Sequence, residues 1–181
     1  MTTTETTSAE EAPDSLAERV NNRSRRPSSD AFREFMGSQW GPRPDPGITR
    51  SAVADYLPAR ATAAGEPFAG ERLVIPAGSY KVRSNDCTYR FRAYSAFAHL
   101  SGLGQEREPD SVIVLEPLPE GGHEAVLYFK PRTSRSSQEF YSDSRYGEFW
   151  VGARPSLEEV ATETGLRCEH IDTPVSYTHL T

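Results

Sequence analysis

The feature that most constrains this chain is a short run of four apolar residues, Val112–Leu115. The run has no polar position and is bounded by turn-forming residues, which is typical of a strand covered on both faces, and the strand is predicted over Ser111–Glu116. A second predicted strand, Ala125–Phe129, follows after a segment that contains Gly121 and Gly122. Two adjacent glycines favour a tight turn, so the two strands are expected to be consecutive in one sheet.

Helical patterns are found on both sides of these strands. A short helix is expected over Ser95–Leu100. Further along, Ser156 and Glu159 form a capping box that starts a helix, and Gly165 is its expected stop. The remaining predicted strands are Arg72–Ile75 and Arg167–Ile171. Strands that alternate with helices indicate an α/β domain with a mixed β-sheet flanked by helices.

The first third of the chain is expected to lead into this domain. Residues 1–29 have almost no large apolar side chains, so their burial cannot offset the entropy of ordering, and disorder is predicted. Residues 30–70 are expected to form a helical lead-in, with Asp30 as the N-cap of its first helix, then a Pro-rich linker. A second helical stretch follows, which Pro58 must break or restart because it lacks an amide donor.

Three further assignments complete the domain map. The α/β domain itself is expected to span residues 71–174. Within it, Lys130–Gly147 is polar and is predicted to be a loop. Residues 175–181 read like one translated frame of a library-preparation adapter, so they are expected to be an assembly artefact, with an ordinary strand or linker as the alternative.

Composition argues against several classes of protein. The net charge of -6 and the pI near 5.3 disfavour a general nucleic-acid-binding surface. No apolar run approaches the roughly 20 residues that a membrane span needs, and the N-terminus lacks the pattern of a signal peptide. Cys87 and Cys168 lie far apart and fit no metal-binding spacing, so free thiols and a cytoplasmic location are expected.

No motif in the chain predicts catalysis by itself. The four histidines form no metal-binding pattern, and no nucleophile motif is present. Cys87 and His99 can be imagined as a nucleophile and its base, but the sequence offers no third group to orient them. We therefore expect no catalytic residue and no metal ligand in this chain.

An ordered set of short motifs carries a family resemblance. It consists of Asn85-Asp86, Phe91-Arg92, Ser95-x-Phe97-x-x-Leu100-Ser101-Gly102, two apolar strands, and Trp150-x-Gly152-x-Arg154. In this order, the chain from about Phe32 to Asp172 resembles the N-terminal domain of Xaa-Pro aminopeptidases (aminopeptidase P). The N-domains of prolidase and creatinase are weaker matches. The resemblance implies a ribonuclease-H-like N-terminal domain.

The resemblance also implies a function for the complete protein. Aminopeptidase P enzymes are metalloproteases that remove the N-terminal residue preceding proline. They hold two divalent metal ions, typically manganese, in a C-terminal pita-bread domain. Two Asp, one His and two Glu bind the metals there. A water that bridges the two ions attacks the peptide bond. That domain is expected to begin after this chain ends. This part is then expected to be non-catalytic, to pack against its own C-terminal domain and to form homo-oligomers, dimers or tetramers.

The resemblance points to two site residues, Trp150 and Arg154. In tetrameric relatives, the Trp of such a segment reaches toward the active site of a neighbouring subunit. An indole offers a rigid apolar face that suits a proline ring, whereas the alternative is a buried core Trp. Arg154 is expected either to pair with a carboxylate or to be solvated.

Two alternatives to the peptidase stay open at this point. The chain could be a stand-alone binding or oligomerisation module, or the N-domain of a prolidase or creatinase relative. Downstream coding sequence separates the first alternative from the enzyme: an Asp, Asp, His, Glu, Glu ligand set supports the peptidase, and a stop codon supports the module.

Overall fold

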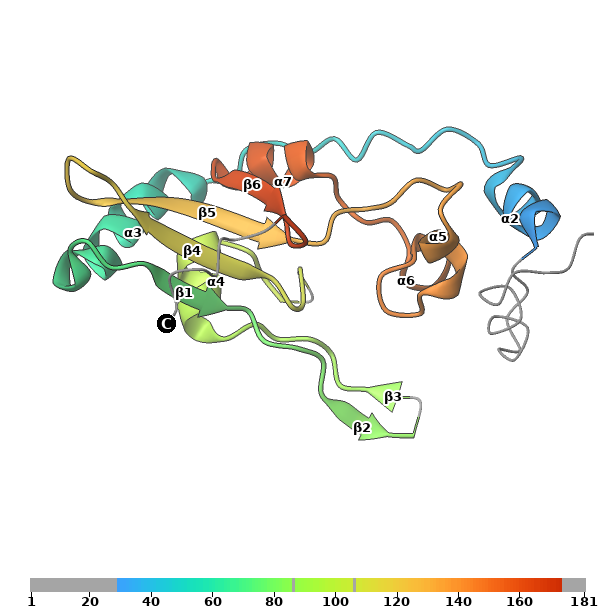
Figure 1. The fold of residues 1–181 in the computed structure, drawn as a ribbon, viewed down its shortest axis with the longest axis horizontal. Helices are drawn as coiled ribbons and strands as arrows, with labels where there is room; N and C mark the ends of the chain where they lie inside the picture. Colours follow the sequence, from blue (N-terminus) through green and yellow to red (C-terminus); the bar gives the residue numbers. More distant parts are fainter. Residues whose placement is uncertain (1–28, 86, 106, 174–181) are drawn as a thin grey trace, which may run out of the picture.

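The computed structural model describes residues 29–173, apart from 86 and 106, and has a four-stranded mixed sheet at its centre (Figure 1). The strands lie in the order β1 (Leu73–Pro76), β4 (Val112–Pro117), β5 (His123–Phe129) and β6 (Arg167–His170). The pairs β1–β4 and β4–β5 are antiparallel, and β6 runs parallel to β5. The predicted α/β class with a mixed sheet is therefore confirmed.

The β4–β5 hairpin forms the middle of the sheet, as the two apolar runs predict. Ile113 lies opposite Leu127 in the register, and Val114 lies opposite Val126. At the turn, Gly121 and Gly122 both have positive φ angles, a conformation that side chains rarely adopt. Because successive strand residues alternate between faces, Ile113 and Val114 belong to opposite sides of the sheet.

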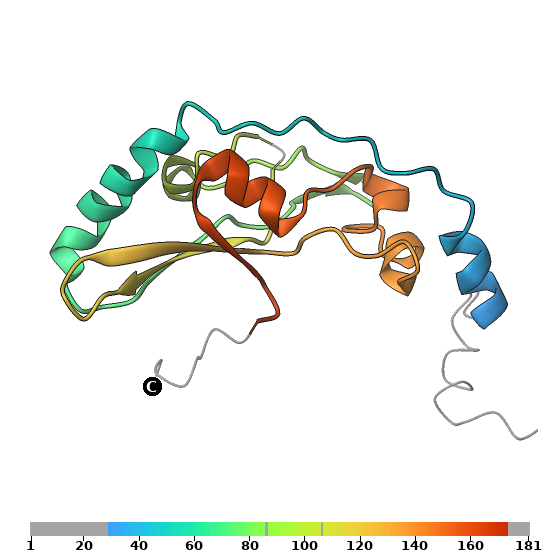
Figure 2. The same ribbon diagram turned by 90° about the horizontal axis from the view of Figure 1, so that it is seen from above.

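Three helices contribute to one core on a single face of the sheet (Figure 2). They are α3 (Leu57–Gly65), α4 (Ser95–Ser101) and α7 (Leu157–Thr164). Their buried side chains include Leu57, Phe97 and Val160, which pack in the same cluster as Ile113 and Phe129. The opposite face carries a smaller buried cluster, made of Val114, Val126 and Tyr128 with Val112 and Ile171 at its margin.

Several predicted helix boundaries are confirmed in atomic detail. The Ser156 hydroxyl accepts from the Glu159 amide, and the Glu159 carboxylate accepts from the Ser156 amide, which completes the capping box. Gly165 ends that helix with a φ of 70°. Pro58 lies in the first turn of α3, directly after the 3-10 helix Ala54–Tyr56, so it restarts the helix as expected.

The predicted cap of the first helix, α2 (Asp30–Gly37), is wrong by one residue. Ser29 is the N-cap, and its hydroxyl accepts from the Phe32 amide at 3.2 Å. Asp30 lies instead in the first helical turn, where its carboxylate pairs with Arg33. Both residues are good capping types, and the extended backbone of Ser29 decides between them.

The prediction of a loop over Lys130–Gly147 is also wrong in part. Helix α5 (Gln138–Ser142) forms there because Ser137 caps it and because Phe140 and Tyr141 are buried. A further helix, α6 (Glu148–Val151), follows directly. Outside the predicted elements, β2 (Val82–Ser84) and β3 (Cys87–Thr88) form a small antiparallel ribbon that projects from the body of the domain (Figure 1).

The N-terminal part contributes to the domain through α3 and the 3-10 helix Glu66–Phe68 that follows it. Leu57 and Ala61 of the expected lead-in belong to the same core as the sheet. The expected tail lies outside the described residues except for Ser29, and so do residues 175–181. None of the helices that the structure describes combines the length and the apolar character that a bilayer crossing requires.

The two thiols are predicted to differ sharply in reactivity. Both thiols are free. Cys87 is exposed on β3, whereas Cys168 on β6 is partly buried, and this burial raises the pKa of its thiol to about 12. Because the thiolate is the nucleophile, iodoacetamide at about pH 8 should alkylate Cys87 at least about a hundredfold faster than Cys168. Mass spectrometry over time measures both rates. Cys87→Ser should abolish the fast phase, and equal rates at the two sites would contradict this placement of β6.

Candidate functional site

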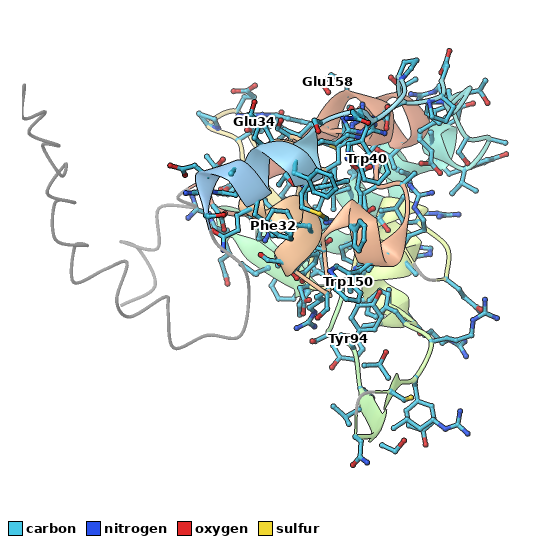
Figure 3. The ribbon with its side chains drawn as sticks, turned by 90° about the vertical axis from the view of Figure 1, so that its right-hand side faces the viewer. Phe32, Glu34, Trp40, Tyr94, Trp150 and Glu158 are labelled. Atoms are coloured by element: carbon cyan, nitrogen blue, oxygen red, sulfur yellow. The ribbon has the colours of Figure 1, made fainter. Side chains whose placement is uncertain are left out.

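Trp150 projects from α6 at the end of the molecule that also carries α2 and α5 (Figure 3). Its side chain is 60% exposed, so the alternative of a buried core Trp is wrong. The indole Nε1 donates a hydrogen bond to the carbonyl oxygen of Tyr141 at 2.6 Å. The ring of Phe149 meets it edge-on, with 5.7 Å between centroids. Since its single polar group is satisfied, the exposed part of Trp150 is an apolar ring face.

Two glycines allow the backbone to present α6 in this way. A Cβ at Gly147 would lie 2.5 Å from the carbonyl oxygen of Asp143. It would also lie 2.6 Å from the carbonyl oxygens of Glu139 and Phe140, so only glycine fits against the end of α5. Gly152 follows α6 with a φ of 83°, a left-handed conformation that glycine adopts readily and that turns the chain sharply.

Arg154 anchors the segment that follows α6. Its side chain is 9% exposed and pairs with Glu108 at 3.1 Å, so of the two alternatives left open by the sequence, the structure shows the pairing with a carboxylate. Its Nη2 also donates to the carbonyl oxygen of Lys130 at 2.6 Å. Within the described residues its buried Nη1 has no hydrogen-bond partner, but the guanidinium lies 5.0 Å above the Tyr146 ring, a favourable cation–π arrangement.

Glu108 is the buried partner of this pair, with 4% of its side chain exposed. Burial raises the pKa of Glu108, and the positive charges of Arg154 and Arg107 oppose that rise. Its backbone is left-handed, with a φ of 48°, which is unfavourable for a residue with a Cβ. Such a conformation persists only where surrounding contacts hold it, and the ion pair to Arg154 is one of them.

Asp110 makes a second ionic contact from the same loop. Its carboxylate pairs with Arg145 at 2.8 Å and accepts a hydrogen bond from the Tyr146 hydroxyl. Burial, followed by this hydrogen bond, raises the pKa of Tyr146 above its ordinary range. Glu108 and Asp110 therefore form an acidic loop that holds the α5–α6 segment, residues 138–154, onto the body of the domain.

Metal-binding side chains are not clustered among the described residues of this site. Across the described part of the chain, no three His, Cys, Asp or Glu side chains are grouped so that they could hold a metal ion. The two carboxylates of the acidic loop, Glu108 and Asp110, are already paired with Arg154 and Arg145. The arrangement is therefore suited to presenting the aromatic surface of Trp150.

Comparison with known proteins identifies relatives of this arrangement. Residues 59–177 match the family described as "Aminopeptidase P, N-terminal domain". The chain is 41% identical over 139 residues to Xaa-Pro aminopeptidase 2 of Streptomyces coelicolor, covering 77% of this chain and 29% of that protein. It is 44% identical, also over 139 residues, to Xaa-Pro aminopeptidase 1 of the same organism, covering 76% of this chain and 27% of that protein.

Solved structures show the same fold. Aminopeptidase P from Escherichia coli, in a low-pH form, superposes with a TM-score of 0.51 at 23% identity, over 65% of this chain and 24% of the enzyme. Proline aminopeptidase P II from Yersinia pestis gives 0.52 at 26% identity, over 66% and 24%. These neighbours confirm the fold expected from the resemblance.

The lengths of these matches carry two further facts. The chain spans less than a third of the curated Streptomyces relatives that it matches. The family match begins at residue 59, and fewer than 139 residues lie between that position and Thr181. The 139-residue match to the Streptomyces relatives must therefore begin before residue 59.

Removing Arg154 should destabilise the domain strongly. Arg154→Ala leaves Glu108 buried without its partner, which typically costs about 3–5 kcal/mol of unfolding free energy. Urea denaturation followed by circular dichroism measures the loss. The double variant Arg154→Met, Glu108→Leu should recover most of it, because both charges are then gone. Arg167→Ala, which removes an exposed arginine, is the control and should change little. An unfolding free energy of Arg154→Ala equal to that of the wild type would refute the anchoring role.

Proposed function

Because this chain belongs to the family of aminopeptidase P N-terminal domains, we propose that it is the N-terminal, non-catalytic part of a Xaa-Pro aminopeptidase. Such an enzyme hydrolyses the bond between an N-terminal residue and a following proline. The relatives at 41% and 44% identity carry the name of this activity. The observation that supports a role for this domain is the exposed Trp150, whose polar group is already satisfied.

The proposal assigns the catalytic chemistry to a domain outside these 181 residues. Less than a third of each relative is matched, so most of the length of those enzymes lies elsewhere. The described residues do not fit a two-metal site, since they contain no cluster of metal-binding side chains. We therefore assign two manganese ions to the C-terminal domain, where bound metal would supply an activated water. The unpaired Cys87 and Cys168 support a cytoplasmic location.

In this proposal Trp150 extends the substrate site of a neighbouring subunit in a homo-oligomer. Its free ring face matches the apolar pyrrolidine of a substrate proline, and a rigid indole loses little entropy on contact. Phe149 and Val151 are also exposed, at 48% and 45%, so the apolar surface extends beyond one ring. Arg154 is buried beneath this segment, which favours a role in positioning Trp150 over direct contact with the peptide.

The test is Trp150→Ala in the complete enzyme. Losing an aromatic contact at a binding site should lower kcat/KM for Xaa-Pro peptides roughly ten- to a hundredfold. The unfolding free energy should fall by only about 1 kcal/mol, because the exposed indole makes one hydrogen bond to Tyr141. Steady-state kinetics and urea denaturation on the same preparation measure both quantities.

Tyr56→Ala is the matched control for this substitution. Tyr56 is an exposed aromatic residue at 63%, and it lies in the 3-10 helix before α3, outside the α5–α6 segment. Its removal should leave kcat/KM unchanged. A Trp150→Ala enzyme with normal kcat/KM, or one whose only defect is a large loss of stability, would contradict the proposed role.

A further inference from the structure

The N-terminal segment from Ser29 to Ile48 is here named the strap. It begins with α2, which lies beside α5, and then runs along the domain toward α3 (Figures 1 and 2). We propose that the strap residue Arg43 is a positioning residue for Trp150 and so sets how tightly the enzyme binds the substrate at the shared site. This inference rests on the proposed function. The strap lies upstream of residues 59–177, the part that matches the family.

The ionic contact between the strap and α6 carries the proposal. Arg43 pairs with Glu148 at 2.5 Å through Nη2, and its Nε lies 3.1 Å from the same carboxylate oxygen. The other oxygen of Glu148 accepts from the backbone amide of Arg154 at 3.1 Å. The Glu148 carboxylate, which is 9% exposed, therefore links Arg43 of the strap to the backbone of Arg154. Glu148 and Arg154 lie on either side of Trp150 in the chain. Nη2 of Arg43 also donates to the carbonyl oxygen of Thr133 at 3.1 Å.

Aromatic contacts lead from the strap to Trp150 by a second route. The Trp40 ring meets Phe140 edge-on at 5.2 Å and Phe149 at 6.5 Å between centroids. Phe149 in turn contacts Trp150. The guanidinium of Arg135 lies 5.3 Å from the Trp40 ring. Figure 3 shows Trp40 and Trp150 at the same end of the molecule.

A third route passes through the helix of the strap. Phe32 of α2 packs edge-on against Tyr141, with 5.4 Å between ring centroids. The carbonyl oxygen of Tyr141 is the acceptor for the indole of Trp150. The strap therefore contacts α5 and α6 at three separate places, and Phe149 and Tyr141 are direct neighbours of Trp150.

The strap is attached at the surface and does not form part of the core. None of its residues belongs to either buried cluster. From Trp40 onward it lines a groove of about 670 Å³, with Arg43, Pro44 and Ile48 among the lining residues. A substitution at Arg43 should therefore leave the sheet intact and change only the position of α6.

The first experiment observes Trp150 in this chain without any peptidase activity. The chain has two tryptophans, so 5-fluorotryptophan labelling gives two 19F resonances, and Trp150→Phe assigns them. Arg43→Ala should shift or broaden the Trp150 resonance and speed amide hydrogen exchange at residues 150–152 on the order of tenfold. Exchange in β5 should not change. Arg43→Lys, which keeps the charge, should restore the resonance in part.

The matched control is Arg33→Ala. Arg33 also lies on the strap and has an ion pair, but its partner Asp30 belongs to the strap itself. The Trp150 resonance should be the same as in the wild type. A Trp150 resonance and exchange rates unchanged by Arg43→Ala would overturn the proposal. If Arg43→Ala lowers protection in β5 as well, Glu148→Gln gives the same test from the α6 side.

The second experiment uses the complete enzyme. Arg43→Ala should raise KM for an Xaa-Pro peptide roughly three- to tenfold with little change in kcat, as expected for a loss of binding. In a Trp150→Ala background, the same substitution should have no further effect, because Arg43 acts through Trp150. An undiminished effect in that background overturns the positioning role. If Trp150→Ala alone leaves kcat/KM normal, the proposed function fails, while the 19F result still decides whether Arg43 positions the indole.

Discussion

The buried ion pair between Arg154 and Glu108 holds together the part of the domain that bears Trp150. Helices α5 and α6 have only five and four residues, and helices of that length are not stable alone. Arg154 links three segments by contacting Glu108 in the loop before β4 and the carbonyl oxygen of Lys130 after β5. Because removing one partner would leave a buried charge, the contact fixes this geometry even if its net contribution to stability is modest.

Polar contacts of the α5–α6 segment also orient the exposed side chain of Trp150. Trp150 packs little of its ring area, so hydrophobic burial cannot hold it in place. Its orientation depends on the hydrogen bond to Tyr141, the close fit of Gly147 against α5, and the carboxylate of Glu148. Directional polar contacts thus orient Trp150, whereas close packing orients core residues such as Phe97.

The sheet and its longest hairpin could be predicted because their signals are local and strong. The apolar run at Val112–Leu115, the glycine pair at the turn, and the capping box of Ser156 and Glu159 each specify one structure. Pro58 likewise left few conformations open to its helix. These elements agree with their predictions to within a few residues.

The rest could not be predicted, because its local signals are weak or its determinants are distant in sequence. Helix α5 lies in a polar stretch, and Phe140 and Tyr141 were its only apolar signal, together with Ser137 as a cap. The ribbon of β2 and β3 has exposed residues throughout, so it shows no alternating pattern. The pairing of Arg154 with Glu108 joins residues 46 positions apart, a contact that only the folded chain brings together.

The central claim is that Trp150 of one subunit serves the active site of another. Subunit complementation tests it most directly: Trp150→Ala enzyme is co-assembled with a variant of the complete enzyme that lacks one catalytic metal ligand. Each parent should be weakly active or inactive. The account predicts that the mixed oligomers exceed the summed activity of the two parents, because intact catalytic domains then receive Trp150 from a neighbour. Activity equal to that sum, in preparations shown to contain mixed oligomers, would contradict it.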